Sequence, residues 1–173
     1  ALTLGTGVGG GAVQGGRLLL GSTGTASEFG HMRVAAGGHP CRCGARGCLE
    51  AYAGSYGLER TVRELLGERP RARSRLRGAA FTPKDVSMAA EGGDPLAREA
   101  WRRVGSALGV AVVNLVYAFN PGAVVFCGGL SRAGRLYLGA VRAAADAESF
   151  RGPFSALRFA VARRLDLGAV GAA

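Results

Sequence analysis

The order of the expected elements predicts an α/β or α+β protein, not a helical bundle or a solenoid. Short apolar segments separated by glycines fill the first part of the chain, and a long segment with helical periodicity follows. A short apolar strand and a second helix come after it. With 173 residues, 48% of them apolar, the chain is long enough for one domain with a sizeable core.

The N-terminal segments are expected to form short strands. Residues 2–4 predict a strand that runs into a glycine loop at residues 5–11. Gly15 and Gly16 lie between two apolar runs, which is the pattern of a β-hairpin. A further strand is expected at residues 32–34, before an irregular stretch rich in Gly and Cys.

Two helices are expected in the middle of the chain. Residues 48–66 have mainly helical character, with interruptions at Gly54 and Gly57. Thr82, followed by Pro83 and an acidic residue, is typical of a helix start, because threonine caps the first turn and proline fits its first position.

The longest predicted helix covers residues 96–119. Its apolar residues recur mostly every three or four positions, so one face is expected to be buried. Asp94 and Pro95 repeat the helix-start pattern, and Asn120 followed by Pro121 ends the segment.

The C-terminal part predicts a strand–turn–helix unit. Residues 123–127 form a short apolar strand, residues 128–129 a glycine turn and residues 132–146 a helix. Residues 157–162 predict one more strand, and residues 168–173 the start of a further helix.

The formal net charge is +10, but the basic residues include a single lysine, Lys84. Arginines are densest at residues 69–77, which we interpret as a solvated surface loop. No aromatic residues interleave this stretch to stack bases, so we expect no nucleic-acid partner. No apolar run reaches the roughly 20 residues that a membrane helix needs, and no signal peptide is apparent.

The glycine loop has two functional interpretations. Gly5, Gly7 and Gly10 have the spacing of a dinucleotide-binding fingerprint, but that motif requires a helix directly after it, and a hairpin is expected here. A strand–loop–strand that wraps a nucleotide phosphate fits better, with backbone N–H groups and the Thr6 hydroxyl as donors. The alternative is an ordinary glycine-rich turn.

A group of cysteines predicts a metal site. Cys41, Cys43 and Cys48 lie within eight residues and supply three thiolates. A closed zinc site needs a fourth ligand, commonly histidine. His39 is too near Cys41 to occupy an adjacent corner easily, so we choose His31, ten residues upstream of Cys41. Four protein ligands make the zinc structural. Free thiols are the alternative.

Two acidic residues flank this group. Glu28 precedes His31 by three residues, and Glu50 follows Cys48 by two. Carboxylates beside an imidazole that a metal orients can accept hydrogen bonds from a polyol. From spacing alone, surface charge is the favoured interpretation of either acid. Cys127 lies far away in an apolar run and is interpreted as a buried thiol outside the site.

Four stretches together resemble the ROK family of sugar kinases and repressors, over essentially the whole chain. LTLGTGVGGG (residues 2–11) resembles its second phosphate loop, and EFGH (residues 28–31) its sugar motif. HPCRCGARGCLEAYAG (residues 39–54) resembles its zinc knot, which is the most specific element. NPGAVVFCGGL (residues 120–130) resembles its strand and turn on the nucleotide side. Bacterial glucokinases are the most similar subgroup.

The resemblance implies an α/β protein of the actin-like ATPase (ribonuclease H-like) fold, with residues 1–173 as its larger C-terminal lobe. It implies phosphoryl transfer from ATP with Mg²⁺ to a hexose, glucose first, at the 6-hydroxyl. The implied cofactors are a structural zinc ion, ATP and Mg²⁺. A hexose is the partner, a homodimer is a candidate assembly, and the reduced thiols favour the cytoplasm.

The resemblance also assigns site residues. It implies that the sugar hydroxyls are bound by Glu28, His31 and Glu50. It implies that zinc is held by His31, Cys41, Cys43 and Cys48. The residues expected at the ATP phosphates are Gly5, Thr6, Gly7, Gly9, Gly10 and Gly11, and those expected near the adenosine are Gly128 and Gly129.

The chain departs from the family pattern in two motifs. The first phosphate motif, D-x-G-x-T, and the Asn-Asp pair that contains the catalytic base do not occur at the expected positions. We therefore expect the chain to be part of a longer protein, with the base upstream of Ala1, and to be inactive by itself. The alternatives are the sugar-sensing lobe of a ROK repressor and a zinc module for protein contacts, which leaves the glycine loop unexplained.

Overall fold

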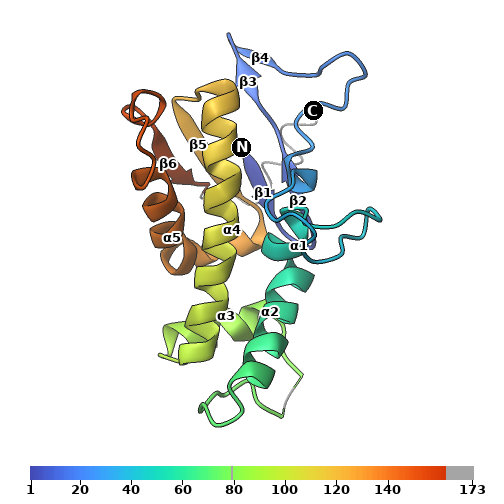
Figure 1. The fold of residues 1–173 in the computed structure, drawn as a ribbon, viewed down its shortest axis with the longest axis vertical. Helices are drawn as coiled ribbons and strands as arrows, with labels where there is room; N and C mark the ends of the chain where they lie inside the picture. Colours follow the sequence, from blue (N-terminus) through green and yellow to red (C-terminus); the bar gives the residue numbers. More distant parts are fainter. Residues whose placement is uncertain (79, 163–173) are drawn as a thin grey trace.

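A computed structural model describes residues 1–78 and 80–162 and shows a four-stranded sheet covered by long helices (Figure 1). The strands of this sheet, in chain order, are β1 (Leu2–Leu4), β2 (Val8–Gly10), β5 (Ala123–Cys127) and β6 (Arg158–Val161). Helices α4 (Pro95–Phe119) and α5 (Gly134–Asp146) lie together across one face of the sheet. The α/β class predicted from the sequence is confirmed.

The sheet has the order β2-β1-β5-β6. Strand β1 pairs with β2 in antiparallel fashion, with Leu4 opposite Val8. It pairs with β5 in parallel, with Leu2 opposite Phe126, and β5 is also parallel to β6. Because β1 and β5 run in the same direction, the loops that follow them leave the sheet at the same edge.

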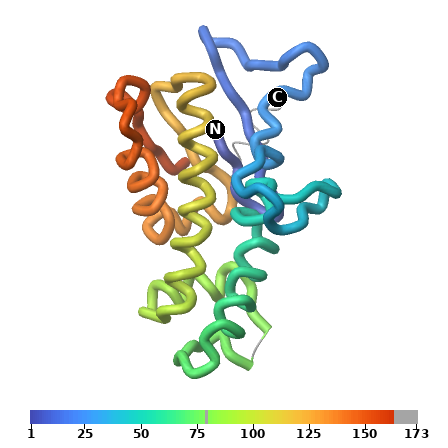
Figure 2. The backbone as a smooth tube through the Cα atoms, viewed as in Figure 1, coloured from blue at the N-terminus to red at the C-terminus, as the bar shows by residue number. Residues whose placement is uncertain are grey.

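The predicted hairpin is present. Strands β3 (Val13–Gln14) and β4 (Arg17–Leu18) pair around Gly15 and Gly16, which have φ angles of +58° and +76°. Two successive positive φ angles are those of the turn that joins tight hairpins, and glycine adopts them without strain. The hairpin extends from the top of the molecule in the backbone trace (Figure 2).

Side-chain caps begin the helices where the sequence predicted. At α3 (Pro83–Glu91), the Thr82 hydroxyl accepts the N–H of Asp85, whose carboxylate accepts the Thr82 N–H in return. At α4, the Asp94 carboxylate accepts two backbone N–H groups, and Asn120 ends the helix with φ +44°.

The helical stretch after the cysteines divides once, not twice. Gly54 has an extended conformation and separates α1 (Glu50–Ala53) from α2 (Ser55–Glu68). The expected interruption at Gly57 is wrong, because Gly57 lies inside α2. A Cβ atom there would stand 2.6 Å from the carbonyl oxygen of Ala51, so glycine lets the two helices approach closely.

Several element boundaries also differ from the prediction. The strand expected at residues 32–34 does not form: a 3-10 turn, η1 (Phe29–His31), precedes it, and only an isolated bridge joins Arg33 to Cys48. A 3-10 turn, η2 (Gly129–Ala133), precedes α5, and another, η3 (Gly152–Phe154), precedes β6. The helix expected at residues 168–173 lies outside the described residues.

The core lies between the sheet and α4. Trp101 of α4 is 1% exposed and lies near the ring of Tyr137 on α5, with 6.0 Å between ring centroids. A Cβ atom at Gly105 would stand 2.5 Å from the Tyr137 carbonyl oxygen, so this glycine sets the spacing of α4 and α5. Burial of such apolar surface is the main stabilising term of this region.

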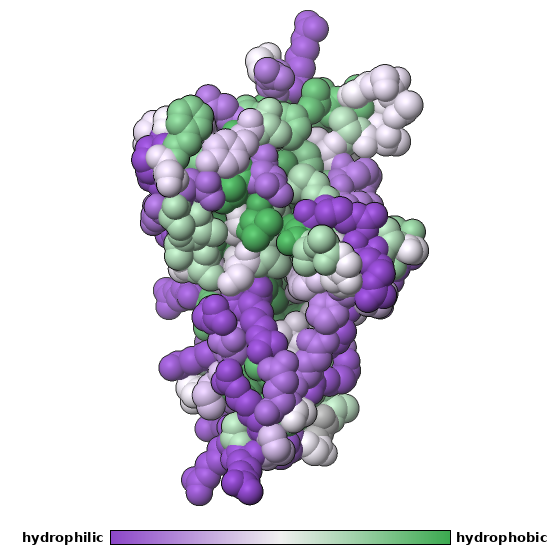
Figure 3. All heavy atoms as spheres, viewed as in Figure 1, coloured by the Kyte–Doolittle hydropathy of each residue, from purple (hydrophilic) through white to green (hydrophobic). Residues whose placement is uncertain are grey.

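The lower part of the molecule is a helical extension whose visible face is hydrophilic (Figure 3). The arginine-rich residues 69–77 form an irregular connection between α2 and α3, as expected of a surface loop. Leu76 anchors this loop in the core. Among the helices of residues 1–78 and 80–162, none is both long and apolar enough to cross a membrane.

Candidate functional site

Four side chains that the sequence singled out come together beside the N-terminal end of α1. The ligand atoms of His31, Cys41, Cys43 and Cys48 all lie within 4.8 Å of one another. Cys43 Sγ is 3.8 Å from Cys48 Sγ, and His31 Nδ1 is 3.8 Å from Cys41 Sγ. With Zn–S bonds of about 2.3 Å, the edge of a tetrahedron is about 3.8 Å, so this donor set fits zinc.

The backbone around these side chains is held by hydrogen bonds between segments that lack regular structure. The Val34 N–H donates to the Gly47 carbonyl oxygen at 2.8 Å, and the Leu49 N–H donates to that of Met32 at 2.9 Å. Gly47 has φ +79°, which glycine adopts without strain. These links bring residues 32–35 against residues 46–49, so that His31 and Cys48 lie close together.

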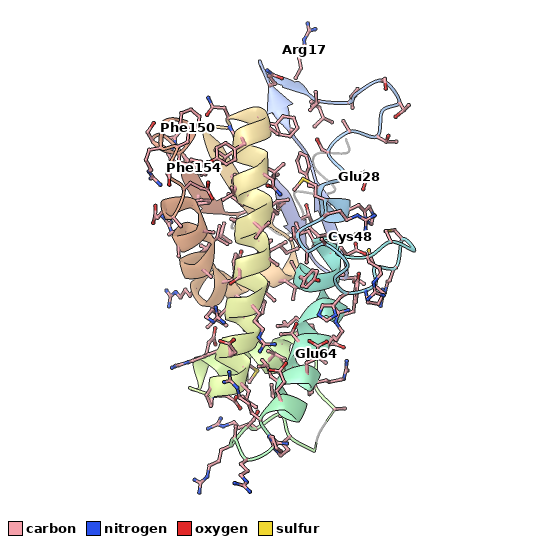
Figure 4. The ribbon with its side chains drawn as sticks, viewed as in Figure 1. Arg17, Glu28, Cys48, Glu64, Phe150 and Phe154 are labelled. Carbon is pink, nitrogen blue, oxygen red and sulfur yellow. The ribbon has the colours of Figure 1, made fainter. Side chains whose placement is uncertain are left out.

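The four ligand positions differ in exposure. Cys48 is fully buried, which raises the pKa of its thiol to about 11. Cys43 is exposed, and its hydrogen bond to the backbone N–H of Ala45 lowers the pKa of its thiol. The Arg33 guanidinium lies 3.6 Å from Cys48 Sγ and favours the thiolate that a metal requires. The cluster is therefore buried at Cys41 and Cys48 and exposed at His31 and Cys43. Figure 4 shows where Cys48 lies in the molecule.

The structure places His39 outside this cluster. Its ring lies 5.0 Å from that of Tyr52, and its Nε2 is 3.7 Å from the Glu64 carboxylate on α2. Burial, and secondarily the charge of Arg60, lower the pKa of His39. The choice of His31 over His39 as the histidine near the three thiols agrees with this arrangement.

Glu50 connects the cysteine cluster to the glycine loop. Its Oε2 accepts the backbone N–H of Val8 at 3.1 Å. Its Oε1 is 3.7 Å from Cys41 Sγ and accepts the hydroxyl of Tyr56 at 3.3 Å. Burial raises the pKa of Tyr56 above its usual range, so the hydroxyl remains a donor. Sequence spacing did not identify this connection.

The glycine loop is shorter than predicted, because Val8–Gly10 forms β2. The remaining turn is closed by the Gly5 N–H, which donates to Gly7 O at 3.0 Å, and is tied to α2 by the Ser55 N–H, which donates to Gly5 O at 3.0 Å. Thr6, at its tip, is exposed.

The glycines of this loop have different surroundings. A Cβ atom at Gly10 would overlap the carbonyl oxygen of Ser27, so packing against the backbone requires this glycine. One at Gly7 would overlap Glu50 Oε2, which would have to move. Gly5 and Gly11 have no atom within 4 Å of a Cβ atom, and Gly9 has only an ordinary contact. The open side of the loop is the one a ligand can approach.

The Gly128–Gly129 turn lies beside the start of the same loop. Gly128 has φ +84°, and a Cβ atom there would stand 2.5 Å from the carbonyl oxygen of Leu4, at the end of β1. Gly129 faces open space. The two glycine segments predicted at the nucleotide thus leave the sheet at one edge, where α/β proteins commonly bind ligands.

Among the predicted sugar-binding residues, Glu28 has the weakest link to the rest of the site. It is exposed, and within residues 1–78 and 80–162 its carboxylate makes no hydrogen bond. Its carbonyl oxygen accepts the N–H of His31 at 3.0 Å, so η1 fixes its position relative to the cluster. Figure 4 shows Glu28 on the same side of the molecule as Cys48.

Sequence reasoning missed Tyr56 and Arg33, which contact the cluster from outside. Tyr56 follows Glu50 by six residues, but the break at Gly54 separates their helices, so helical periodicity does not predict the contact. Cys127, predicted to be a buried thiol, is half-buried, with its Sγ 3.1 Å from the Thr3 hydroxyl across the sheet.

The fold and the site together define an α/β protein with a zinc-type ligand cluster joined to a glycine turn at the edge of a parallel sheet. A sequence model described as the ROK family matches residues 1–173. The chain belongs to the ROK family, so the resemblance drawn from the sequence is confirmed.

Known relatives include kinases and regulators. A glucokinase of Halalkalibacterium halodurans is 42% identical over 137 residues, which are 77% of this chain and 42% of that protein. The DNA-binding regulator NagC of Escherichia coli is 32% identical over 145 residues, 84% of this chain and 35% of that protein. The chain thus spans less than half the length of these relatives.

A solved structure shows the same fold. The ROK glucokinase of Streptomyces griseus, crystallised with glucose and AMPPNP, matches with a TM-score of 0.86 and 33% identity, over 99% of this chain and 58% of that one. ROK sugar kinases have the actin-like ATPase fold, so the fold predicted from the resemblance is confirmed.

Proposed function

We propose that this chain is the C-terminal lobe of an ATP-dependent hexose kinase, with glucose as the first candidate substrate. The observation that carries the proposal is the position of Glu50. One of its carboxylate oxygens accepts a backbone N–H of the glycine loop, and the other lies beside the cysteine cluster. A site for phosphate and a site for a polyol would therefore meet at this side chain.

The cluster would hold a structural zinc ion through His31, Cys41, Cys43 and Cys48. The donor set and spacing fit a closed tetrahedral site, and zinc in such a site supplies folding energy without an open coordination position. Because His31 Nδ1 faces Cys41, Nε2 is free to contact a sugar hydroxyl. The cluster would thereby fix the orientation of the imidazole.

Glu50, Glu28 and His31 would bind the sugar. A carboxylate has about four acceptor positions, and hydrogen bonds to Val8 and Tyr56 occupy two of those on Glu50. The remaining positions can accept sugar hydroxyls. Glu28 is exposed and close in sequence to His31, so its carboxylate can turn toward the same ligand.

The glycine segments would bind ATP with Mg²⁺. Gly5, Thr6, Gly9 and Gly11 present open backbone or a hydroxyl toward the phosphates, and Gly129 is open near the proposed adenosine position. Gly7, Gly10 and Gly128 serve close packing that shapes the same edge. Phosphoryl transfer also needs a base near the sugar hydroxyl, which we place upstream of Ala1.

An assay of the full-length protein tests this proposal. We expect glucose phosphorylation that depends on ATP and Mg²⁺, and none from residues 1–173 alone. Absence of hexose phosphorylation by the full-length protein, with zinc loaded, would contradict the kinase proposal. Robust phosphorylation by residues 1–173 alone would contradict the assignment of the base to upstream sequence.

The sugar-sensing lobe of a transcriptional repressor is the second candidate, favoured by the similarity to NagC. The coding sequence upstream of Ala1 distinguishes the two. A D-x-G-x-T motif followed by an Asn-Asp pair would support the kinase, and a helix-turn-helix pattern without that aspartate would support the repressor. The higher identity to the glucokinases supports the kinase.

A further inference from the structure

Tyr56 lies where two anionic groups of the proposed site come close together. Cys41 Sγ is 3.7 Å from Glu50 Oε1. When Cys41 binds a metal it is a thiolate, which cannot donate a hydrogen bond to the carboxylate. Two negative groups at this distance repel each other unless a donor or a positive charge lies next to them.

The Tyr56 hydroxyl is such a donor. It lies 3.3 Å from Glu50 Oε1 and 3.7 Å from Cys41 Sγ, so its single proton can be shared by both acceptors. The hydroxyl comes from α2, whereas Glu50 lies on α1 and Cys41 in the preceding loop. Tyr56 therefore joins three separate segments at one point.

Arg42 holds the Tyr56 ring in place. Its guanidinium lies 4.5 Å from the ring centroid, in the geometry of a cation–π contact. Arg42 lies between the two ligands Cys41 and Cys43 in the sequence, so this contact links α2 to the cysteine-bearing segment.

We propose that Tyr56 is a positioning residue that acts on both halves of the site. Its hydroxyl stabilises the Cys41 thiolate toward zinc and holds the Glu50 carboxylate in the orientation that receives the sugar. The second role rests on the proposed function, whereas the first depends only on the metal cluster.

The test uses the full-length protein and the variant Tyr56→Phe, which keeps the ring and its contact with Arg42. Loss of an outer-shell partner lowers metal affinity by about 10- to 100-fold, and we expect about tenfold weaker zinc binding in competition with a coloured chelator, measured without sugar. We expect KM for glucose to rise about tenfold, because a hydrogen bond to a charged group is lost. The value of kcat should change less than about twofold, since Glu50 contacts the sugar equally before and during transfer.

Tyr52→Phe is the matched control. It also removes a hydroxyl beside the cluster, but the Tyr52 oxygen accepts the His39 N–H at 2.9 Å, whereas the hydrogen bonds to Glu50 Oε1 and Cys41 Sγ come from Tyr56. We expect zinc affinity and KM to stay within about twofold of the unmodified protein. If Tyr56→Phe behaves like Tyr52→Phe in both measurements, the proposal is overturned.

Two further variants separate the roles. In a Glu50→Gln background, Tyr56→Phe should still weaken zinc binding but change glucose affinity less than about twofold, since the partner carboxylate is already gone. Arg42→Gln should weaken zinc binding and glucose binding by less than Tyr56→Phe does. If the protein phosphorylates no hexose but Tyr56→Phe still weakens zinc binding, the proposed function fails and the role toward Cys41 stands. Unchanged zinc affinity in Tyr56→Phe overturns that role whatever the kinase assay gives.

Discussion

Helix α4 and the cysteine-bearing loop at residues 32–48 are held in place by different forces. Helix α4 buries a continuous apolar face that includes Trp101, Val104 and Leu108, and it begins and ends at capping residues next to it in sequence. The loop has two isolated bridges, and its three cysteines converge with His31, the residue just before it. The helix depends on apolar burial, and we propose that the loop depends on a metal ion. Changes in one region should therefore leave the other largely intact.

The largest effect on stability is expected in the helical region. Trp101→Ala removes a side chain that is 1% exposed and should cost about 3–5 kcal/mol of unfolding free energy. Urea denaturation measures the loss. Zinc affinity of the folded protein should stay within about twofold, and a large parallel loss of zinc would show that the two regions are not independent.

The reverse experiment changes the loop. His31→Ala should weaken zinc binding by more than about 100-fold, since even outer-shell partners cost about 10- to 100-fold, and it should also weaken glucose binding. His39→Ala is the control, because His39 lies by Glu64 and away from the cluster. Chelator competition and glucose titration measure both effects. Loss of zinc in the His39 variant, with retention in the His31 variant, would reverse the ligand assignment.

A smaller effect is expected at the first turn of α4. Asp94 accepts the N–H groups of Leu96 and Ala97 and, from the connection between α2 and α3, the hydroxyl of Ser74 and the N–H of Arg75. Asp94→Ala should cost about 1–2 kcal/mol, as measured by urea denaturation.

The same residue predicts a pH dependence. Burial alone would raise the pKa of Asp94, but its hydrogen bonds to Ala97, Ser74, Arg75 and Leu96 lower it overall. A carboxyl whose pKa is lowered on folding stabilises the protein above its unfolded value of about 3.9, and this stability is lost as pH falls through the folded-state pKa. The stability difference between the unmodified protein and Asp94→Ala should therefore be constant from pH 7 to 5 and shrink below pH 4. A difference that grows on acidification would contradict this.

The smallest effect on stability should accompany a clear effect on function. In Gly7→Ala the new Cβ overlaps Glu50 Oε2 and must displace this carboxylate from the Val8 N–H. We expect KM for glucose to rise about tenfold, with less than about 1 kcal/mol change in stability.

Gly67→Ala, in α2, is the matched control for Gly7→Ala, because nothing lies within 4 Å of its Cβ position. Alanine should add up to about 1 kcal/mol of helix stability without changing KM. Equal KM values in the two glycine variants would argue against a role of Glu50 in sugar binding.

The sequence predicted α4 well because its signals are local. Asp94, Pro95 and the apolar periodicity lie within the helix or next to it, and the structure begins and ends the helix within one residue of the expected bounds. The four metal-ligand candidates could also be named, because three cysteines within eight residues are rare without a common role.

Other features depend on contacts between distant segments. Residues 32–34 have the composition of a strand, but their partner is residues 47–49, and only the Arg33–Cys48 bridge forms. The sequence predicted that Gly57 interrupts the helix, whereas in the structure this glycine makes room for the carbonyl group of Ala51. The contact of Tyr56 with Glu50 crosses Gly54, where the sequence predicted an interruption but not how the two helices are placed relative to each other.

The central claim is that a zinc-ordered cluster forms the sugar pocket. It is tested most directly by titrating glucose into the full-length protein in three states: zinc-loaded, zinc-stripped and zinc-restored. We predict that stripping weakens glucose binding by more than about 100-fold, consistent with the coupling of structural zinc to local folding. Restoring zinc should recover the glucose affinity. The midpoint of urea denaturation, which reports on the α4 core, should change little between the three states. Equal glucose affinity in the stripped and loaded proteins would contradict the account.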